Sequence, residues 1–269
     1  MNRIDSLMLF ASFDISNATS FKYRHDEWPD LYHKIICLLE QKLSKDNGWT
    51  FWKANGDELL FNRAVDKRVT VERQVKLVDH IMANEIANLH KKVKLQNIQQ
   101  LSIKAAVWIA AIRQYETGSK DTGNGMDFRI DCGGKTDFFG KEMDIGFRIS
   151  KHVPRSKTAL SAALVYYLIK GRSRIVKKLR IIGHKSMKGV LHEKRYPIIW
   201  LFRARSPRRI EKSFHYDEKY ENDLISEFVD KIKSDGNHGK IDSIEYENML
   251  EYMGLKEDYE KHILDFKAS

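Results

Sequence analysis

The spacing of apolar residues predicts alternating strands and helices in the N-terminal part of the chain. Residues 7–13 form an almost uninterrupted apolar run, which is typical of a buried strand. Over residues 28–43 apolar side chains recur at helical spacing, which predicts a helix with one buried face. Residues 49–52 and 58–61 flank Asn55-Gly56, a dipeptide that favours the tight turn of a β-hairpin.

The remaining pattern completes a recognisable order of elements. It predicts a long amphipathic helix over 69–93, a strand over 101–112, a loop over 116–126, a helix over 140–152, and strands over 162–169, 179–182 and 197–202. Through residue 112 the order is β-α-β-β-α-β, which is that of the ferredoxin-like fold. We therefore expect an α+β protein with this core, extra C-terminal strands and a small helical tail.

The C-terminal part differs from the rest of the chain in charge. Residues 206–269 hold 10 Lys+Arg and 16 Asp+Glu, although the whole chain carries +10. Two apolar stripes at helical spacing, Leu224/Phe228/Ile232 and Tyr246/Leu250/Met253, predict two or three short helices there. We expect a main domain over 1–205 and an acidic helical extension over 206–269. The basic main domain favours an anionic ligand, either a triphosphate or a nucleic acid, or simply presents a solubilising surface.

Composition limits the class of protein further. Two cysteines, Cys37 and Cys132, are too few for a disulfide framework, so we expect a cytoplasmic protein. No stretch is apolar enough to span a membrane. The apolar run at 7–13 is interpreted as the first strand, not as a signal peptide.

Two acidic residues occupy turns that the predicted sheet brings together. Asp14 follows the first strand, and Asp57 lies in the hairpin. Because these elements are neighbours in a ferredoxin-like sheet, both carboxylates are able to face one point. Two carboxylates and a backbone carbonyl suit Mg²⁺ or Mn²⁺. Taken alone, either aspartate is more often an ordinary turn residue.

A third segment runs from Asp137 through Gly140 into the helix predicted at 140–152. Asp144 and Arg148 are four residues apart on that helix and so share a face. Taken alone, this spacing is also that of a surface salt bridge.

Together the three segments resemble the class III adenylyl and guanylyl cyclases, in the same order and with similar gaps. The first is Asp14-Ile15, two residues, then Ala18-Thr19, where the family has Phe-Thr. The second runs from Lys53 to Gly56-Asp57. The third has Asp137, Gly140, Asp144 in place of the usual Asn, and Arg148. The resemblance covers about residues 5–203.

This resemblance implies a role for each position. Asp14 and Asp57, helped by the Ile15 carbonyl, would hold two Mn²⁺ or Mg²⁺ ions. Backbone N–H groups around Asn17, Ala18 and Thr19 would bind the triphosphate. Lys53 and Asp137 occupy base-recognition positions, Arg148 would stabilise charge on the reacting phosphate, and Lys188 is a candidate triphosphate contact. The family builds its sites between two chains, which implies a homodimer.

The departures from the family pattern point to a particular subgroup. Asp144 would pair with Arg148 or contact the ribose. The pattern of Trp52–Glu58 and Asp144–Arg148 resembles the bacterial pyrimidine cyclases of Pycsar antiphage defence. That implies conversion of UTP or CTP to a cyclic nucleotide that triggers a separate effector. The aromatic residues Trp49, Phe51, Trp52, Phe138 and Phe139 either narrow a base pocket or belong to the core.

Three alternatives stay open. Lys53 with Asp137 is also similar to the adenine-reading pair of adenylyl cyclases. A diguanylate cyclase shares the fold, but Asn55-Gly56-Asp57-Glu58-Leu59 departs from its hairpin motif. A ferredoxin-like sheet also binds RNA through aromatics on its strands, although strand 101–112 lacks that signature, so we expect neither a nucleic-acid nor a membrane partner.

Overall fold

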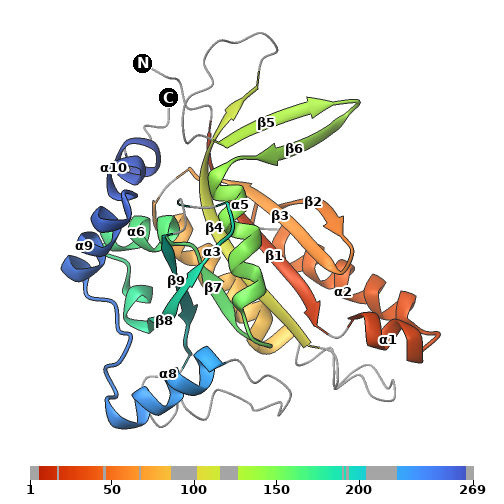
Figure 1. Cartoon of the computed structure of the whole chain (residues 1–269). Helices are drawn as coiled ribbons and strands as arrows, with labels where there is room; N and C mark the ends of the chain where they lie inside the picture. The colour runs from red at the N-terminus through yellow and green to blue at the C-terminus, as the bar shows by residue number, and fades with distance from the viewer. Residues whose placement is uncertain are drawn as a thin grey trace.

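The computed structural model describes residues 6–16, 18–44, 47–66, 68–85, 102–115, 127–189, 191, 194–203 and 223–264. A sheet of mixed direction forms its centre, with helices on both faces (Figure 1). Its strands are β1 Ser6–Ser16, β2 Thr50–Asn55, β3 Glu58–Ala64, β4 Ser102–Gln114, β5 Asp127–Cys132, β6 Lys135–Phe139, β7 Thr158–Leu160, β8 Leu179–Ser186 and β9 Arg195–Leu201.

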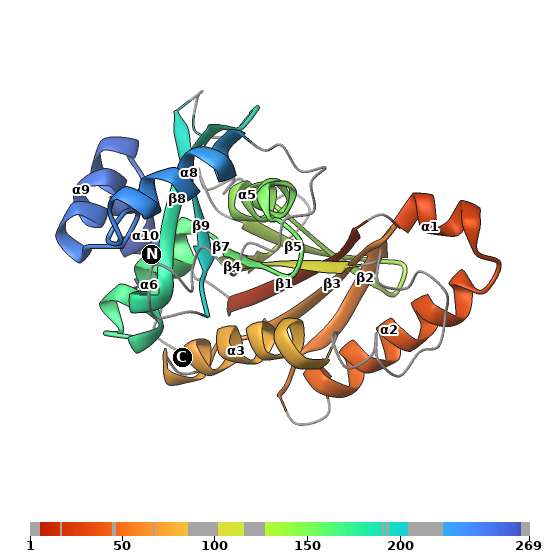
Figure 2. The same cartoon turned by 90° about the horizontal axis from the view of Figure 1, so that it is seen from below.

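The helices surround this sheet. They are α1 Ala18–Arg24, α2 Trp28–Ser44, α3 Arg68–His80 with a π-helical turn over Ile81–Glu85, α5 Lys141–Ile149 with a 3-10 turn over Ser150–His152, α6 Ala162–Lys170, a 3-10 turn over Arg174–Lys178, α8 Asp223–Ser234, α9 Ser243–Met253, and α10 Lys256–Tyr259 with a π-helical turn over Glu260–Leu264. Figure 2 shows α2 and α3 on one face of the sheet and α5 on the other.

The strand order confirms the predicted ferredoxin-like core. The sheet runs β2-β3-β1-β4 and continues through β7, β9 and β8. β1 pairs antiparallel with β3 and β4, whereas β4 pairs parallel with both β5 and β7. The hairpin, the helix at 28–43, the strand at 101–112 and the helix at 140–152 are likewise confirmed.

Close packing fixes α5 against the sheet. Phe10 of β1 stacks on Trp108 of β4 with ring centres 5.6 Å apart, and both are buried. Gly146 of α5 lies directly over the indole: a Cβ at this position would come within 2.3 Å of the Trp108 ring. Only glycine lets the helix approach this closely, so the segment after Gly140 is held firmly on the sheet.

One predicted strand is wrong. Residues 162–169 form helix α6, which begins where the Ser161 side chain accepts a hydrogen bond from the Leu164 N–H at 3.2 Å. Its residues are buried from Ala162 to Leu168, so no polar face interrupts the apolar run. The sequence of a helix that is buried on every side has no polar residues at helical spacing. Such a sequence therefore resembles that of a buried strand.

The pattern also missed the β5–β6 hairpin and the short strand β7. The β5–β6 turn is Gly133-Gly134, both at positive φ, which glycine adopts without strain. Of the predicted helix at 69–93, residues 68–85 are helical; residues 86–93 and the predicted loop at 116–126 lie outside the described residues.

The C-terminal helices pack on the main domain. The Tyr246 hydroxyl donates to the Ala162 carbonyl at 3.0 Å, and Lys170 pairs with Glu247 at 2.7 Å. Phe228 and Ile232, like the second predicted stripe, are buried; the side chain of Leu224 lies outside the description. The boundary at 205/206 stays a prediction. None of the described helices is long and apolar enough to cross a membrane.

Candidate active site

Asp14 lies near the end of β1, between two charged neighbours. It is opposite Glu58 on β3 and Lys104 on β4. The Lys104 Nζ lies 2.9 Å from an Asp14 carboxylate oxygen, and the two side chains are 13% and 26% exposed. Lys104 was not predicted as a site residue, although a lysine in an otherwise apolar strand was a usable signal.

The hairpin turn brings Asp57 beside the same end of β1. The Ile15 N–H donates to the Asp57 carbonyl at 3.2 Å. The buried Tyr32 hydroxyl of α2 has no hydrogen-bond partner among the described residues. Burial raises the pKa of Tyr32, and the charges of Asp57 and Asp14 raise it further. The charges of both carboxylates therefore act on the same hydroxyl group, that of Tyr32. This agrees with the expectation that Asp14 and Asp57 lie close together.

Glu58, which is part of the hairpin pattern but received no role from the sequence, extends this group. Ser12 donates a hydrogen bond to its carboxylate. Burial raises the pKa of Glu58, with a further contribution from the Asp14 charge, while hydrogen bonds from Ser12 and Ser150 oppose the rise. Ser150 follows α5 and donates its hydroxyl to the Phe147 carbonyl at 2.9 Å, so the carboxylate of Glu58 lies near the end of the helix that carries Arg148.

The donor set of Asp14, Ile15 and Asp57 suits a divalent cation. It offers two carboxylates and a main-chain carbonyl, the hard oxygen ligands that Mg²⁺ and Mn²⁺ prefer. In the part of the chain that the structure describes, no three His, Cys, Asp or Glu side chains converge closely enough to hold a metal. The remaining ligands would therefore be main-chain, water or substrate oxygens.

Lys53 and Asp137 form a second group. They come from β2 and β6, yet the Lys53 Nζ lies 2.6 Å from the Asp137 carboxylate. The same Nζ is 4.2 Å from the centre of the Trp52 ring, and the Trp52 indole N–H donates to the Thr136 carbonyl at 3.0 Å. The structure thus joins two residues that the sequence separates widely, in a partly exposed position.

The aromatic residues near this pair divide between pocket and core. Trp49 is buried and donates from its indole to Gln74 at 2.7 Å. Phe51 packs edge-on against Phe61, and the buried Phe138 packs against Phe10. Trp52 alone of these described residues contacts Lys53. Trp49 and Phe138 therefore belong to the core and Phe51 packs against it, whereas Phe139 is 42% exposed and stacks on Phe128.

Asp144 and Arg148 pair along α5, as their spacing predicted. Arg148 Nη1 lies 3.7 Å from the Asp144 carboxylate and donates to its main-chain carbonyl at 3.0 Å. Gly189 borders Arg148, because a Cβ added there would lie 3.7 Å from its guanidinium. The exposed Lys188 is therefore in the loop beside Arg148.

Two buried carboxyl groups, those of Asp127 and Glu142, lie at the start of α5. Asp127 accepts hydrogen bonds from the N–H groups of Glu142 and Met143 at 3.3 and 3.1 Å. Burial raises the pKa of Asp127 to about 7 and, with the charge of Asp127, that of Glu142 to about 8. Gly140 is required here, since a Cβ would come within 2.3 Å of the Asp127 carboxylate.

Positive charge gathers around the end of α5. Burial lowers the pKa of His152, and the charges of Lys185, Lys104 and Lys151 lower it further. Lys104, which is one of these cations, also pairs with Asp14. The region between the end of α5 and Asp14 therefore attracts an anion.

The predicted triphosphate-binding turn is only partly described. Ala18 is buried at the start of α1 and Thr19 is exposed, whereas Asn17 lies outside the described residues. Between described residues, no hydrogen bond or ion pair joins Lys53, Asp137 or Arg148 to Asp14 or Asp57. The residues within each group lie close together. Within one chain, however, the described residues of the Asp14–Asp57 group make no direct polar contact with Lys53, Asp137 or Arg148.

Comparison with solved structures identifies the architecture. The adenylyl cyclase CyaB from P. aeruginosa superposes with a TM-score of 0.53 at 14% identity, covering 73% of this chain and 93% of that one. The guanylyl cyclase Cya2 gives 0.51 at 15% identity, covering 72% and 90%. An adenylate cyclase from Trypanosoma brucei, solved in its monomeric state, gives 0.51 at 11% identity, covering 75% and 90%.

This is the fold of the adenylyl and guanylyl cyclase domains. No protein-family model matches the sequence, and no curated protein matches it either. The cyclase-like fold extends over about three quarters of the chain, in agreement with the span expected from the three sequence segments.

Proposed function

We propose that the protein is a nucleotidyl cyclase, which converts a nucleoside triphosphate into a 3′,5′-cyclic nucleotide and pyrophosphate. The observation that carries this proposal is the meeting of Asp14, Ile15 and Asp57 at one end of β1, in a fold shared with adenylyl and guanylyl cyclase domains. The contact between Lys53 and Asp137, and the Asp144–Arg148 pair, add groups suited to a base and a phosphate.

Each group has a chemical task in this reaction. Divalent cations held by Asp14, Asp57 and the Ile15 carbonyl would lower the pKa of the attacking 3′-hydroxyl and stabilise the leaving pyrophosphate. Lys104 contributes a positive charge at Asp14, beside the place where the phosphates would bind. Arg148 would stabilise charge on the reacting phosphate with the rest of its guanidinium, since both contacts with Asp144 are made by Nη1.

A homodimer explains why the two groups do not touch in one chain. In this arrangement Asp14 and Asp57 of one protomer face Lys53, Asp137 and Arg148 of its partner. The Lys53–Asp137 pair is exposed enough to meet a ligand held by a second protomer.

For the substrate we propose a pyrimidine nucleotide, with UTP ahead of CTP. Lys53 donates and Asp137 accepts hydrogen bonds, which matches the O4 acceptor and N3–H donor of uracil. Cytosine reverses this pattern, and each group left unpaired costs about 1–3 kcal/mol. The resemblance at Trp52–Glu58 and Asp144–Arg148 supports the pyrimidine assignment. It also supports a cytoplasmic role in antiphage defence, with the product acting on a separate effector.

The test is to incubate the protein with all four ribonucleotides and Mn²⁺ and identify products by mass spectrometry. We expect cyclic UMP and pyrophosphate, and neither from an Asp14→Asn variant. A dominant cyclic AMP peak rejects the pyrimidine assignment in favour of an adenylyl cyclase. Absence of any cyclic product, with retention of labelled RNA, supports a nucleic-acid-binding domain instead.

A further inference from the structure

The C-terminal helices reach the start of α5, the helix that carries Arg148. Lys141 is the first residue of α5, and its Nζ lies 2.8 Å from the carboxylate of Asp258 on α10. The next residue of α5, Glu142, is only 5% exposed. Two segments that lie far apart in the sequence therefore meet at the first turn of this helix.

A small cavity marks the junction of these segments. Its volume is about 10 Å³, close to the smallest space that holds a water molecule. Glu142 of α5 lines it together with Asp127 of β5 and with Asp258 and Tyr259 of α10. The Tyr259 side chain is 2% exposed. Burial raises the pKa of Tyr259 and the charge of Glu142 raises it further, so these two groups lie close together. α10 thus meets the first turn of α5 through polar side chains.

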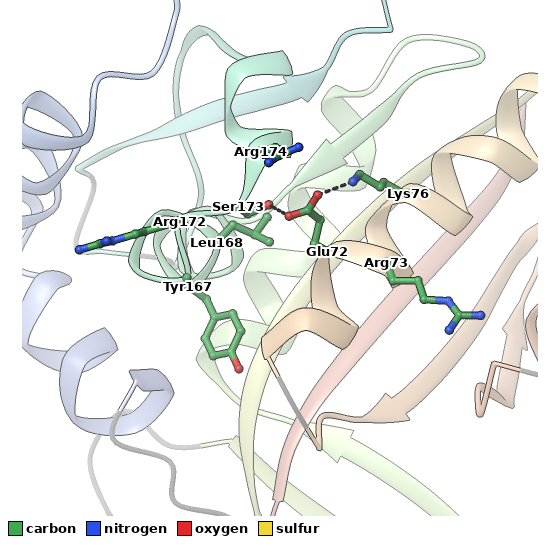
Figure 3. A pocket seen from close by; sticks show the side chains of 9 residues that line it. Glu72, Arg73, Lys76, Tyr167, Leu168, Arg172, Ser173 and Arg174 are labelled. Atoms are coloured by element: carbon green, nitrogen blue, oxygen red, sulfur yellow. Dashed lines mark hydrogen bonds and ion pairs between the residues drawn. The ribbon is translucent and has the colours of Figure 1, made fainter.

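Helix α6, which supports the C-terminal helices, is itself fixed to the main domain. The Tyr166 hydroxyl of α6 donates to the Glu260 carboxylate, directly after α10, at 2.9 Å. Beyond the other end of α6, Ser173 donates to the Glu72 carboxylate of α3, as a dashed line in Figure 3 marks. Because α6 is held at both ends, α10 presents Asp258 to α5 from a defined position.

A displacement at the start of α5 is transmitted to its end. Arg148 follows Glu142 by six residues, which corresponds to ~9 Å along a helix. Between them Gly146 lies against the Trp108 indole, with no space for a Cβ. Closely packed segments transmit strain because they have no voids to absorb it. The contacts made at the first turn of α5 therefore help to determine the position of Arg148.

We propose that Asp258 and Tyr259 are positioning residues of the cyclase, which hold the first turn of α5 and thereby place Arg148 at the reacting phosphate. This inference rests on the function proposed above, because it gives the contact a task in that reaction. Neither residue touches the substrate. A displacement of about 1 Å in a catalytic group costs up to about a hundredfold in rate. Since Arg148 would act on charge that develops in the transition state, loosening α5 should lower kcat more than it changes KM.

The test compares the steady-state kinetics of two double variants of the whole chain. Asp258→Asn/Tyr259→Phe removes the polar contacts with α5 but keeps the ring of Tyr259 in place. We expect kcat to fall at least about fivefold, with KM changed less than about twofold. Glu257→Gln/Tyr252→Phe is the matched control, because it removes one charge and one hydroxyl from exposed positions of the same helices and should change neither constant. Asp258→Glu, which keeps the charge, should retain most of the turnover.

Hydrogen exchange followed by mass spectrometry tests the same contact without the reaction. Amides of α5 should exchange faster in Asp258→Asn/Tyr259→Phe than in the wild type. Amides of β1 should exchange as before, which would show that the change is local and that the variant is folded.

Three outcomes would overturn the inference. Normal kcat in Asp258→Asn/Tyr259→Phe would show that the contact does not position Arg148. An equal loss of kcat in the control would indicate a general effect of the C-terminal surface. A raised KM with unchanged kcat would make the contact part of substrate binding. If the wild-type chain forms no cyclic nucleotide, the proposed function fails and the catalytic task fails with it, whereas faster exchange in α5 would still show that α10 holds this helix.

Discussion

The ammonium group of Lys104 lies 2.9 Å from the carboxylate of Asp14, across the neighbouring strands β4 and β1. Both side chains are largely shielded from water, so this contact is stronger than an exposed ion pair. A lysine thus supplies a positive charge to one of the two carboxylates that we assign to the divalent cations. The pair also explains how Asp14 is accommodated at the end of a strand whose other residues are mostly buried.

Replacing this lysine should separate its two roles. We expect Lys104→Met to bind Mn²⁺ about fivefold more tightly, because ~1 kcal/mol of competing attraction at Asp14 is removed. Turnover should nevertheless fall, since a cation near the phosphates is lost. Mn²⁺ titration followed by calorimetry measures the first effect. Lys185→Met serves as the control, and weaker Mn²⁺ binding in Lys104→Met would contradict the competition.

The carboxylates themselves should be needed for catalysis but not for folding. Asp14→Asn or Asp57→Asn should lower cyclisation by more than about a hundredfold, because each removes a charged metal ligand. Thermal unfolding should shift little in Asp57→Asn, whereas Asp14→Asn should lower the unfolding temperature, because it removes the counter-charge of the largely buried Lys104. Asp30→Asn, an exposed change on α2, is the control. A variant with near-normal turnover would remove that residue from the proposed metal site.

Complementation tests the shared site. Neither Asp57→Ala nor Arg148→Ala should be active alone. An equal mixture should recover about a quarter of wild-type activity, because half of the dimers are mixed and each of these has one intact site. Absence of rescue in a verified heterodimer would mean that each site lies within a single chain.

The preference between pyrimidines should depend on Asp137. In Asp137→Asn the side-chain amide is able to donate to N3 of cytosine, which the carboxylate cannot do. We expect the ratio of cyclic UMP to cyclic CMP from equal UTP and CTP to fall about tenfold. Lys135→Gln on the same exposed strand is the control. An unchanged ratio would show that Asp137 does not contact the base.

Stability should fall as the pH rises, because of the buried carboxyl groups at the start of α5. Burial raises the pKa of Glu142 to about 8, and that of Asp127 to about 7. Both groups hold a proton more tightly in the folded than in the unfolded chain. Their contribution to stability is therefore complete below the unfolded pKa values and is lost as the pH rises toward 8. Lys141 and Asp258, which pair at 2.8 Å beside Glu142, do not remove this effect.

Urea unfolding between pH 5 and 8 measures this loss. Glu142→Gln should flatten the decline, with a gain in stability at pH 8, because the amide carries no charge to bury. Glu257→Gln, an exposed change on α10, should leave the decline as it is. A Glu142→Gln variant whose stability changes with pH as it does in the wild type would contradict the assignment.

The sequence by itself determined the core of the fold and the positions where chemistry is expected. Local sequence patterns are enough to predict these elements. They are the apolar run at β1, the helical spacing of α2, and Asn55-Gly56 between β2 and β3. These features fix the order of elements, and the order places Asp14 beside Asp57. The resemblance added Lys53, Asp137, Asp144 and Arg148, and the contact between Lys53 and Asp137 is compatible with a shared role.

Only the tertiary structure shows which side chains pair across strands and which are buried. The partner of Asp14 is Lys104 because β4 pairs with β1 at one particular register, which no local pattern records. The run at 162–169 becomes helix α6 because it is enclosed on every side, so its apolar sequence has no polar face to reveal the period. Glu142 is likewise buried only because α5 and the C-terminal helices meet there. Local sequence specifies the elements, whereas contacts between distant segments determine which side chains are enclosed, charged and paired.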